Sequence, residues 1–385
     1  MAPATGPRLR LAWVEEWMST LAREVLPHLA RRHDVTYVTA GDTIPDADFV
    51  RVIRCRRYHH MNLAGFALSR QVDRLHARGL IDLAVVWGSV AFALRRTPFV
   101  SFEGTSVYAQ IGRFASRTTP MKRLRFLAGL VHYAVPEILC NRRAARVVVP
   151  SESLRNDILR LHRLPPDRVV VVPHGAEPQH LRIHGAKRPA ARPRILYVGR
   201  LHVHKGITEV LRAFVRRPDL DADFCIAGDG PSRPLLQALA TGDARVRLLG
   251  PVGRQELEAL LGTTAIFVLP TWYEGFGLAL LEAMASGHAC VCYDLPVLRE
   301  ILGDAGVLVP VGDAGALVDA IAGLLRRPDD IVSMAERAHR RARRFSWDRA
   351  RASIDAILRD TALEIGIGDP GLTNRPAAAT SRAAS

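Results

Sequence analysis

The sequence is poor in cysteine, and the cysteines do not have the spacing of a metal site. Five occur in 385 residues. Cys55, Cys140 and Cys225 lie far apart, whereas Cys290 and Cys292 share one face of a short apolar strand. No second cysteine or histidine pair has zinc-finger spacing. We therefore predict free, buried thiols and no structural zinc.

Long apolar runs are also missing. No stretch approaches the roughly 20 residues of a membrane-spanning helix, and residues 1–10 lack the apolar region of a signal peptide. We therefore expect a cytoplasmic protein. A chain of 385 residues, of which 48% are hydrophobic, suits two α/β domains better than a single core.

Lysine is almost absent, although the chain is strongly basic. The formal charge of +15 comes from 53 basic and 38 acidic residues, yet Lys122, Lys187 and Lys205 are the only lysines. The arginines form two clusters, within 113–125 and 337–344. No zinc finger, RNA-binding aromatic motif or basic zipper accompanies them, so we expect no nucleic-acid partner. Solvated helix faces are the favoured interpretation, and peripheral contact with an anionic membrane is the open alternative.

The stretch 265–287 suits a ligand that carries both phosphate and hydroxyl groups. An apolar run predicts a buried strand, and a turn with glycines on both sides of Phe276 leads into an apolar helix. Glu274 stands at the carboxyl end of the strand, where open α/β sheets bind ligands, and Glu282 is the only charged residue of the helix. The glycines allow close approach, and the helix N-terminus offers N–H groups to an anion. A nucleotide sugar is such a ligand.

A second stretch, 194–206, has a related pattern. An apolar strand ends in Gly199-Arg200-Leu201, and Lys205-Gly206 follows. The glycine lets a ligand approach the strand end, while one arginine and one lysine can straddle a diphosphate. An ammonium group on a flexible stem suits a single phosphate oxygen, so this rare lysine is a candidate for the diphosphate grip.

These motifs resemble those of a known enzyme family. The pattern Glu-Gly-Phe-Gly-Leu-x-x-x-Glu-Ala-Met-Ala, from Glu274 to Ala285, is similar to the signature of the retaining family 4 glycosyltransferases (glycosyl transferases group 1), which include sucrose-synthase and mannosyltransferase relatives. The resemblance implies the GT-B fold: two Rossmann-like, doubly wound α/β domains facing across a cleft. It also implies hexosyl or N-acetylhexosaminyl transfer from a nucleoside diphosphate sugar, with retention of configuration and with neither a metal nor a cofactor.

The resemblance assigns roles to both motifs. Arg200 and Lys205 would hold the diphosphate, Glu274 the hydroxyls of the donor sugar and Glu282 the ribose hydroxyls. The residues expected to bind the nucleotide sugar are Gly199, Gly275, Phe276, Gly277, Leu278 and Glu282.

The first half of the chain departs from the family at two positions. Glu15-Glu16 stands where the family has a glycine-rich turn, and Glu103 stands where it commonly has a histidine facing the donor sugar. We expect Glu103 to take part in catalysis, and Glu15 and Glu16 to lie on the acceptor side of the cleft. Three carboxylates would favour a cationic small-molecule acceptor, such as an amino sugar or aminocyclitol of secondary metabolism. Two alternatives stay open: a lipid-linked acceptor at the membrane surface, and a non-catalytic pseudo-transferase that binds nucleotide sugar.

The same alternation of strands and helices divides the chain. We predict an acceptor domain over 1–178, a linker over 179–193, a donor domain over 194–345, a helix over 346–364 that crosses back to the first domain, and a disordered tail over 365–385. Two Asp-x-Asp triplets, 46–48 and 221–223, precede apolar strands instead of following them. We therefore predict no catalytic metal.

Overall fold

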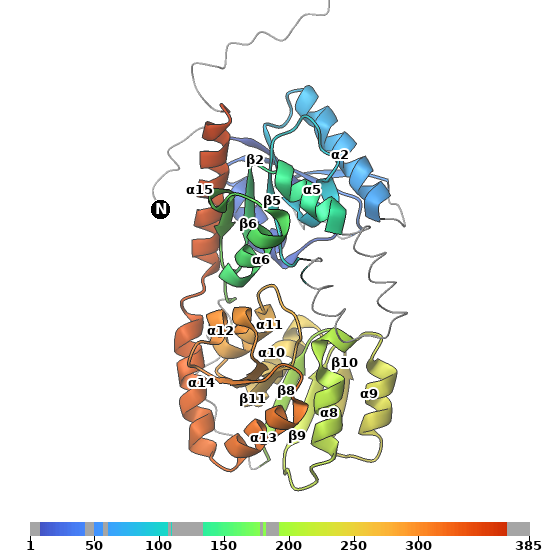
Figure 1. The fold of residues 1–385 in the computed structure, drawn as a ribbon, viewed down its shortest axis with the longest axis vertical. Coiled ribbons are helices and arrows are strands. Elements are labelled where there is room, and N and C mark those ends of the chain that lie inside the picture. Colours follow the sequence, from blue (N-terminus) through green and yellow to red (C-terminus); the bar gives the residue numbers. More distant parts are fainter. Residues whose placement is uncertain are drawn as a thin grey trace, which may run out of the picture.

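A computed structural model describes residues 8–42, 50–56, 61–106, 109, 134–177, 180–181 and 192–367. These residues form two α/β domains placed end to end along the long axis of the molecule (Figure 1). Each domain is built on one parallel sheet with helices packed against it. The predicted fold class, two Rossmann-like domains, is confirmed.

The first domain holds a sheet of seven strands in the order β3-β2-β1-β4-β5-β6-β7. Strand β1 pairs in parallel with β2 on one side and with β4 on the other. Successive strands are added toward one edge of the sheet from β1 to β3 and toward the other edge from β4 to β7, so the topological switch point lies between β1 and β4. Ligands bind at such switch points in doubly wound sheets. The strands are β1 (Arg10–Val14), β2 (Asp34–Thr39), β3 (Arg51–Arg54), β4 (Leu83–Trp87), β5 (Phe99–Phe102), β6 (Arg146–Val149) and β7 (Val169–Val171).

Serine caps begin two of the helices on this sheet. Ser19 accepts a hydrogen bond from the backbone N–H of Ala22, and Ser151 accepts one from Leu154, so each serine satisfies a donor that the first turn leaves unpaired. The described helices are α1 (Thr20–Ala30), α2 (Met61–Ala77), α5 (Val135–Arg143) and α6 (Glu152–His162), with short 3-10 turns η1 (Gly88–Ala91) and η3 (Pro166–Arg168).

The second domain repeats this plan with six strands in the order β10-β9-β8-β11-β12-β13. Its switch point lies between β8 and β11, which pair in parallel. The strands are β8 (Arg194–Val198), β9 (Asp223–Ala227), β10 (Val246–Gly250), β11 (Ile266–Leu269), β12 (Ala289–Tyr293) and β13 (Val307–Val309). The motifs predicted to bind the donor follow β8 and β11, so both lie at this switch point.

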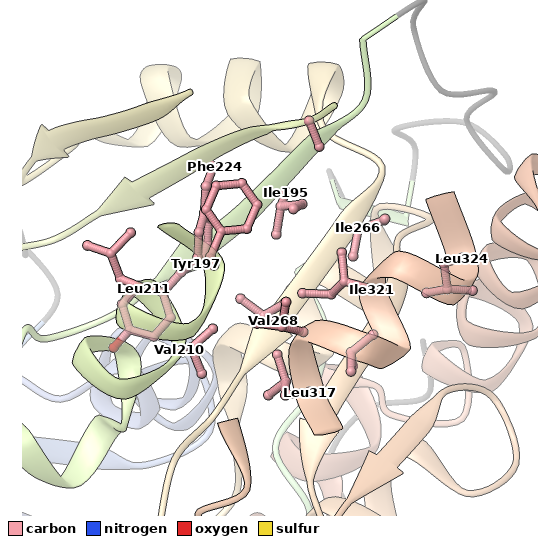
Figure 2. Packing of buried hydrophobic residues seen from close by; sticks show 14 of the residues in the cluster. Ile195, Tyr197, Val210, Leu211, Phe224, Ile266, Val268, Leu317, Ile321 and Leu324 are labelled. Atoms are coloured by element: carbon pink, nitrogen blue, oxygen red, sulfur yellow. The ribbon is translucent and has the colours of Figure 1, made fainter. Parts of the chain in front are cut away.

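A dense core fixes the position of this second sheet. Figure 2 shows side chains of β8, β9 and β11 meeting those of α8 (Ile207–Val215) and α13 (Ala314–Leu325). Tyr197, Phe224 and Val268 are fully buried there. The remaining elements are η4 (Val203–Lys205), α9 (Arg233–Ala240), α10 (Arg254–Thr263), α11 (Leu278–Ala285), α12 (Pro296–Leu302) and α14 (Pro328–Ala342).

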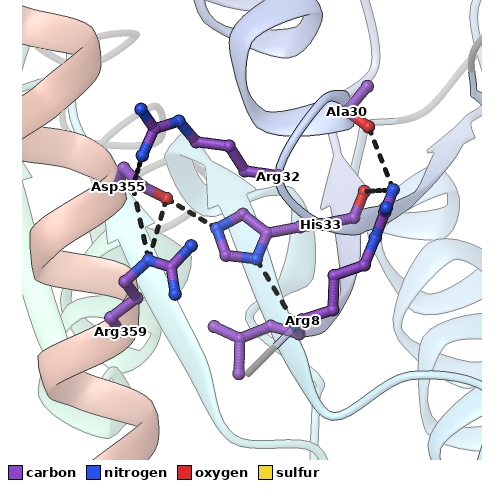
Figure 3. A network of polar contacts seen from close by, with 7 residues as sticks. Arg8, Ala30, Arg32, His33, Asp355 and Arg359 are labelled. Atoms are coloured by element: carbon purple, nitrogen blue, oxygen red, sulfur yellow. Dashed lines mark hydrogen bonds and ion pairs between the residues drawn. The ribbon is translucent and has the colours of Figure 1, made fainter. Parts of the chain in front are cut away.

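The last helix, α15 (Trp347–Glu364), leaves the second domain and packs beside the first (Figure 1). A buried polar network attaches it there (Figure 3). His33 accepts a hydrogen bond from the N–H of Leu9 through Nδ1, and its Nε2 lies 2.6 Å from Oδ1 of Asp355. Arg32 and Arg359 pair with the same carboxylate, at 3.2 and 3.3 Å.

We expect Asp355→Asn to lower the free energy of unfolding by roughly 2–4 kcal/mol, because it removes the charge that several buried or half-buried donors face. Burial alone would raise the pKa of Asp355, but the hydrogen bond from His33 and the charge of Arg359 outweigh it and lower the pKa to about 2. A carboxylate with a depressed pKa contributes stability above its unfolded pKa and loses it on acidification. The difference from wild type should therefore be full at pH 7 and shrink between pH 4 and pH 2 in urea denaturation.

Asp348→Asn, on the same helix, is the matched control. The side chain of Asp348 is 91% exposed, so its pair with Arg351 should contribute less than about 1 kcal/mol. Equal losses in the two variants would show that the Asp355 network does not hold α15.

Several predictions can now be compared with the structure. All five cysteines are free, and four of them are buried. Among the described residues, no helix combines the length and the apolarity needed to cross a membrane. The stretch 120–141, basic early and apolar late, also predicts a long helix; the structure describes only the end of this stretch, where α5 continues to Arg143.

Other predicted features fall partly or wholly outside the described residues. This is true of the arginine cluster within 113–125 and of the triplet 46–48, and of most of the linker and tail. The second triplet is described: Asp223 is buried at the start of β9 and pairs with Arg192 and Arg247, each at 3.2 Å. Its carboxylate therefore serves a local ion-pair network.

Candidate active site

The loop between β11 and α11 carries the strongest sequence motif. Gly277 has φ 100°, a left-handed conformation that glycine adopts without steric cost, and it forms the N-cap of α11. Gly275 has no such backbone requirement. A Cβ there would lie 1.8 Å from the carbonyl oxygen of Gly104 in the first domain. The two domains therefore touch at this glycine.

Lys205 and Glu274, which are 69 positions apart in the chain, form an ion pair. Nζ of Lys205 donates to Oε2 of Glu274 over 2.7 Å, and the side chains are 16% and 18% exposed. Gly206 makes this possible because its φ of 65° lets η4 approach the loop. A Cβ at this position would lie 2.0 Å from the carbonyl oxygen of Pro270. The pair presents one cation and one carboxylate, which can bind a phosphate and a hydroxyl group respectively.

Arg200 follows the end of β8, five positions before Lys205, and it is exposed. Its carbonyl oxygen accepts a hydrogen bond from the hydroxyl of Tyr197 over 3.0 Å. Gly199 precedes it, and a Cβ there would lie 2.9 Å from the same hydroxyl. The backbone of this turn is thus fixed by the core, while the guanidinium group is left in solvent at the switch point.

Glu282 lies on α11, away from the residues that line the cleft. Burial and, to a smaller extent, the charge of Glu177 raise its pKa to about 7, against the opposing charge of Arg254. Arg254 itself donates to Glu177 over 2.6 Å. Glu282 is therefore a half-buried carboxyl group on α11 with a pKa near neutral pH.

A cavity of about 590 Å³ lies between the domains. It brings together six of the predicted site residues: Glu16, Glu103, Glu274, Phe276, Gly277 and Leu278. The other six, Glu15, Gly199, Arg200, Lys205, Gly275 and Glu282, are not among the residues that line it. Its wall also includes Trp17, Trp87, Glu137 and His174, which the sequence did not single out.

The placement of Glu15 corrects the sequence-based expectation. Its side chain is fully buried and accepts hydrogen bonds from the Tyr37 hydroxyl over 2.9 Å and from the Ser19 hydroxyl over 2.8 Å. Burial raises the pKa of Glu15, and these hydrogen bonds partly offset the effect. Because the carboxylate points into the core, it braces the start of α1 and does not face an acceptor. Glu16, the next residue, lines the cavity instead.

Glu103 stands at the end of β5, at the wall of the cavity, and is 4% exposed. Burial and the neighbouring charge of Glu137 raise its pKa well above the usual range of a carboxyl group. Glu137 comes from α5 and is also buried. The structure thus adds a second carboxylate to the one that the sequence identified.

Contacts across the domain boundary surround the Glu274 loop. The Ser151 hydroxyl donates to the carbonyl oxygen of Gly275 over 2.9 Å, and the N–H of Ser106 donates to the Tyr273 hydroxyl over 2.8 Å. Glu300 of α12 accepts hydrogen bonds from the first two N–H groups of α6, over 2.9 and 2.6 Å. A carboxylate at a helix N-terminus is favourable, so this contact helps to hold the domains together.

His174 is also part of this boundary. Its ring lies 5.1 Å from that of Phe276 and 5.4 Å from that of Trp347. Burial lowers its pKa to about 4, so the imidazole is neutral at physiological pH. It packs between the domains at the wall of the cavity.

Two family models match the chain, one in each half. Residues 18–180 match the model described as Glycosyltransferase Family 4, and residues 192–327 match Glycosyl transferases group 1. Together these ranges cover more than two thirds of the chain and follow the two domains. The chain belongs to the GT-B glycosyltransferases.

Curated glycosyltransferases are similar over part of their length. An α-D-kanosaminyltransferase of Streptomyces kanamyceticus is 29% identical over 239 residues, which are 58% of this chain and 62% of that protein. The O-antigen chain mannosyltransferase B of Escherichia coli is 26% identical over 245 residues, 60% of this chain and 62% of that protein. The match thus spans about three fifths of these relatives.

Solved GT-B glycosyltransferase structures resemble nearly the whole fold. A sucrose-phosphate synthase from Thermosynechococcus elongatus superposes with a TM-score of 0.73 at 19% identity, covering 93% of this chain and all of that one. The Anabaena protein HepE, in complex with UDP and glucose, superposes with a TM-score of 0.70 at 16% identity and covers 91% of this chain and 99% of that one.

Proposed function

We propose that this chain transfers a hexosyl or N-acetylhexosaminyl group from a nucleoside diphosphate sugar to a hydroxyl group of a small-molecule acceptor, with retention at the anomeric carbon. The observation that carries the proposal is the ion pair between Lys205 and Glu274, whose carboxylate lines the interdomain cavity. One partner suits a phosphate and the other suits a sugar diol, so the pair matches the two ends of a glycosyl phosphate bond.

The chemistry follows from where negative charge develops. Breaking the bond between the anomeric carbon and the β-phosphate leaves charge on the diphosphate, which Lys205, Arg200 and the N-terminus of α11 would stabilise. Glu274 would exchange its ion pair for hydrogen bonds to donor-sugar hydroxyls when the phosphate engages the lysine. Glu282 would hold the ribose hydroxyls.

The acceptor would occupy the part of the cavity formed by the first domain. Glu16, Glu103 and Glu137 line that part, so an anionic acceptor such as a phospholipid head group is disfavoured. We therefore propose a soluble acceptor, an amino sugar or aminocyclitol of secondary metabolism, and a cytoplasmic enzyme. The lipid-linked alternative depends on arginines within 113–125, which lie outside the described residues. Strict dependence of transfer on anionic liposomes would favour it.

A donor panel tests the proposal. UDP-, GDP-, ADP- and dTDP-sugars are assayed for thermal stabilisation and for slow hydrolysis without acceptor, because bound donor stabilises the folded state by mass action. At least one donor should raise the unfolding temperature and be hydrolysed. Stabilisation without any turnover, with every acceptor tried, would indicate a pseudo-transferase, and no stabilisation would overturn the assignment.

We expect activity to survive excess chelator. Positive charge at the leaving group would come from Lys205, Arg200 and a helix terminus, so no metal is needed to neutralise the diphosphate. Rates measured after dialysis against EDTA should stay within about twofold of the untreated enzyme. Full loss of activity, restored by Mn²⁺ or Mg²⁺, would contradict this prediction.

The two glutamates of the motif should have separable roles. Glu282→Gln is expected to weaken binding of the free nucleoside diphosphate and of the intact donor alike, by roughly tenfold for one charge-assisted contact. Because the pKa of Glu282 is about 7, the loss should be larger at pH 8, where the carboxylate is ionised, than at pH 6. Glu274→Gln should spare nucleotide binding and lower sugar transfer. Calorimetry and transfer assays on both variants check this, and the reverse pattern would contradict it.

A further inference from the structure

The cavity wall is acidic in a basic protein. Four glutamates line it, Glu16, Glu103, Glu137 and Glu274, and no lysine or arginine is among its described lining residues. Glu274 is compensated by Lys205 at the edge of the cavity. The first-domain side has no such cation among the residues lining it, although the chain as a whole has 53 basic residues against 38 acidic ones.

One of these carboxylates has an unsatisfied oxygen. Glu103 is 4% exposed, and its Oε1 is buried without a hydrogen-bond partner in the part of the chain that the structure describes. A buried polar atom without a partner costs about 1–3 kcal/mol, and more when it is charged. The same carboxyl group lines the cavity, so a ligand there can supply the missing donor.

The neighbouring carboxylate is held in place. The Ser106 hydroxyl donates to Oε1 of Glu137 over 2.8 Å, and Nε2 of His162 lies 3.2 Å from the same oxygen. Asn141 extends the network, because its side-chain nitrogen lies 3.2 Å from Nδ1 of His162 and its oxygen accepts from the Ser101 hydroxyl over 2.8 Å. A network of this kind fixes the position of Glu137 before any ligand binds.

Placing two carboxyl groups together in a buried wall has an electrostatic consequence. Burial and the charge of Glu137 raise the pKa of Glu103 and a hydrogen bond from Asn141 partly offsets the effect, so the protonated form of Glu103 is favoured beside Glu137. A monocation bound between the two groups would favour the ionised form and release that proton. The site is therefore suited to a ligand with a positive charge.

The aromatic side chains indicate what else the ligand carries. Trp17 is 56% exposed and lines the cavity together with Trp87. An exposed indole offers a flat apolar surface on which the apolar face of a ring can be buried. A metal ion would not use this surface, and no group of three or more metal-ligating residues occurs among the described positions.

We propose that Glu103 and Glu137 form a subsite for the ammonium group of an aminated ring acceptor, whose ring lies against Trp17. This subsite deepens the proposed function, and its role in sugar transfer rests on that function. Binding of the amine to the subsite does not depend on it. A hydroxyl or N-acetyl group at the same position can donate a hydrogen bond to Glu103 but lacks the positive charge that would compensate two neighbouring carboxylates.

The test compares charged and uncharged versions of one acceptor. With a donor from the panel, transfer is measured to glucose, to glucosamine and to N-acetylglucosamine, and to the 3-amino-3-deoxy and 6-amino-6-deoxy analogues of glucose. At least one amine should exceed its uncharged counterparts in kcat/KM by roughly ten- to a hundredfold. In Glu103→Gln and in Glu137→Gln the preference should fall to within about threefold, whereas Glu336→Gln, an exposed change on α14, should retain it.

A binding measurement separates the subsite from the reaction. Calorimetry of the preferred amine, in two buffers of different ionisation enthalpy, should show more proton release on amine binding by wild type than by Glu103→Gln. Binding of the nucleoside diphosphate shows that each variant is folded. Trp17→Ala should raise KM for amines and sugars alike by roughly tenfold without changing the preference.

The outcomes distinguish the two proposals. If no nucleotide sugar is turned over, the proposed function fails, and calorimetry still decides the subsite. If the donor is turned over but amines have no advantage, or the advantage persists in both glutamine variants, the subsite is overturned. Amine binding without proton release, equal in wild type and Glu103→Gln, would also overturn it.

Discussion

Replacing Lys205 with alanine is expected to lower turnover of the nucleotide sugar by on the order of a hundredfold or more, a loss comparable to that of one oxyanion donor. The ammonium group lies 2.7 Å from Glu274, at the switch point of the second sheet, where the diphosphate would bind. Without it, the leaving diphosphate loses its nearest cation and Glu274 is left partly buried without its partner. Both effects act on the reaction, and neither touches the core.

Arg200→Ala should also lower turnover strongly, because its exposed guanidinium group is placed to meet the same diphosphate. Arg216→Ala, an exposed arginine at the end of α8, is the control and should be neutral. Lys205→Arg should restore part of the lost rate, since it keeps the charge and changes the geometry. Turnover is measured in steady-state assays with the donor found in the panel. Near-normal turnover in Lys205→Ala would contradict the proposal that Lys205 binds the diphosphate.

The second sheet could be predicted almost residue by residue. The apolar runs at 194–198, 223–227 and 289–293 each predict a strand, and the structure has strands over the same residues. Parallel strands that are buried on both faces consist of short, continuous apolar runs between turns, so the sequence indicates where they begin and end. The alternation of strands and helices predicted a parallel sheet, whereas the order of its strands comes from the structure.

The donor-side residues could be predicted because they lie in short, continuous stretches of the chain. Glu274 and the glycines that follow share one loop, and Lys205 follows a glycine-bearing strand end. The direct contact between Lys205 and Glu274 was not predicted, because it depends on two loops that meet only when β8 and β11 become neighbours.

The acceptor side could not be predicted in the same way. Glu137 sits on a helix and His174 in a turn, and only the folded first domain brings them to one cavity. The pair Glu15-Glu16 illustrates a second difficulty, because the two neighbouring side chains face opposite ways. The sequence does not show that the buried hydroxyl of Tyr37 donates a hydrogen bond to Glu15. Glu16 and Glu103 line the cavity on the side where acceptor contacts were predicted, whereas Glu15 is buried in the core.

The contact between the two domains involves the same loop that carries Glu274. Ser151 and Ser106 of the first domain hydrogen-bond to Gly275 and to Tyr273, which flank Glu274. Closure therefore fixes the carboxylate that would bind the donor sugar. This coupling predicts that a change which only prevents closure will impair the reaction without damaging either domain.

Gly275→Ala makes that change with one methyl group, and we expect it to lower turnover by on the order of a hundredfold, as misplacement of a catalytic group can. The new Cβ would lie 1.8 Å from the Gly104 carbonyl oxygen and 3.2 Å from Cγ2 of Thr105, so the two domains cannot approach as they do now. Gly275 is not among the glycines with positive φ, so alanine introduces no backbone strain. The turn that carries Arg200 and Lys205, the side chain of Glu282 and the core of the second domain are unchanged in this variant.

The measurements are turnover, nucleotide binding by calorimetry, and the radius of gyration from small-angle X-ray scattering. Turnover should fall, nucleotide affinity should change by less than about threefold, and the scattering should report a more open molecule. Gly262→Ala, inside α10, is the matched control: a Cβ there meets nothing within 4 Å, and alanine should stabilise the helix by about 0.5–1 kcal/mol. Normal turnover by Gly275→Ala, with scattering like that of wild type, would show that the contact between Gly275 and Gly104 does not control the reaction.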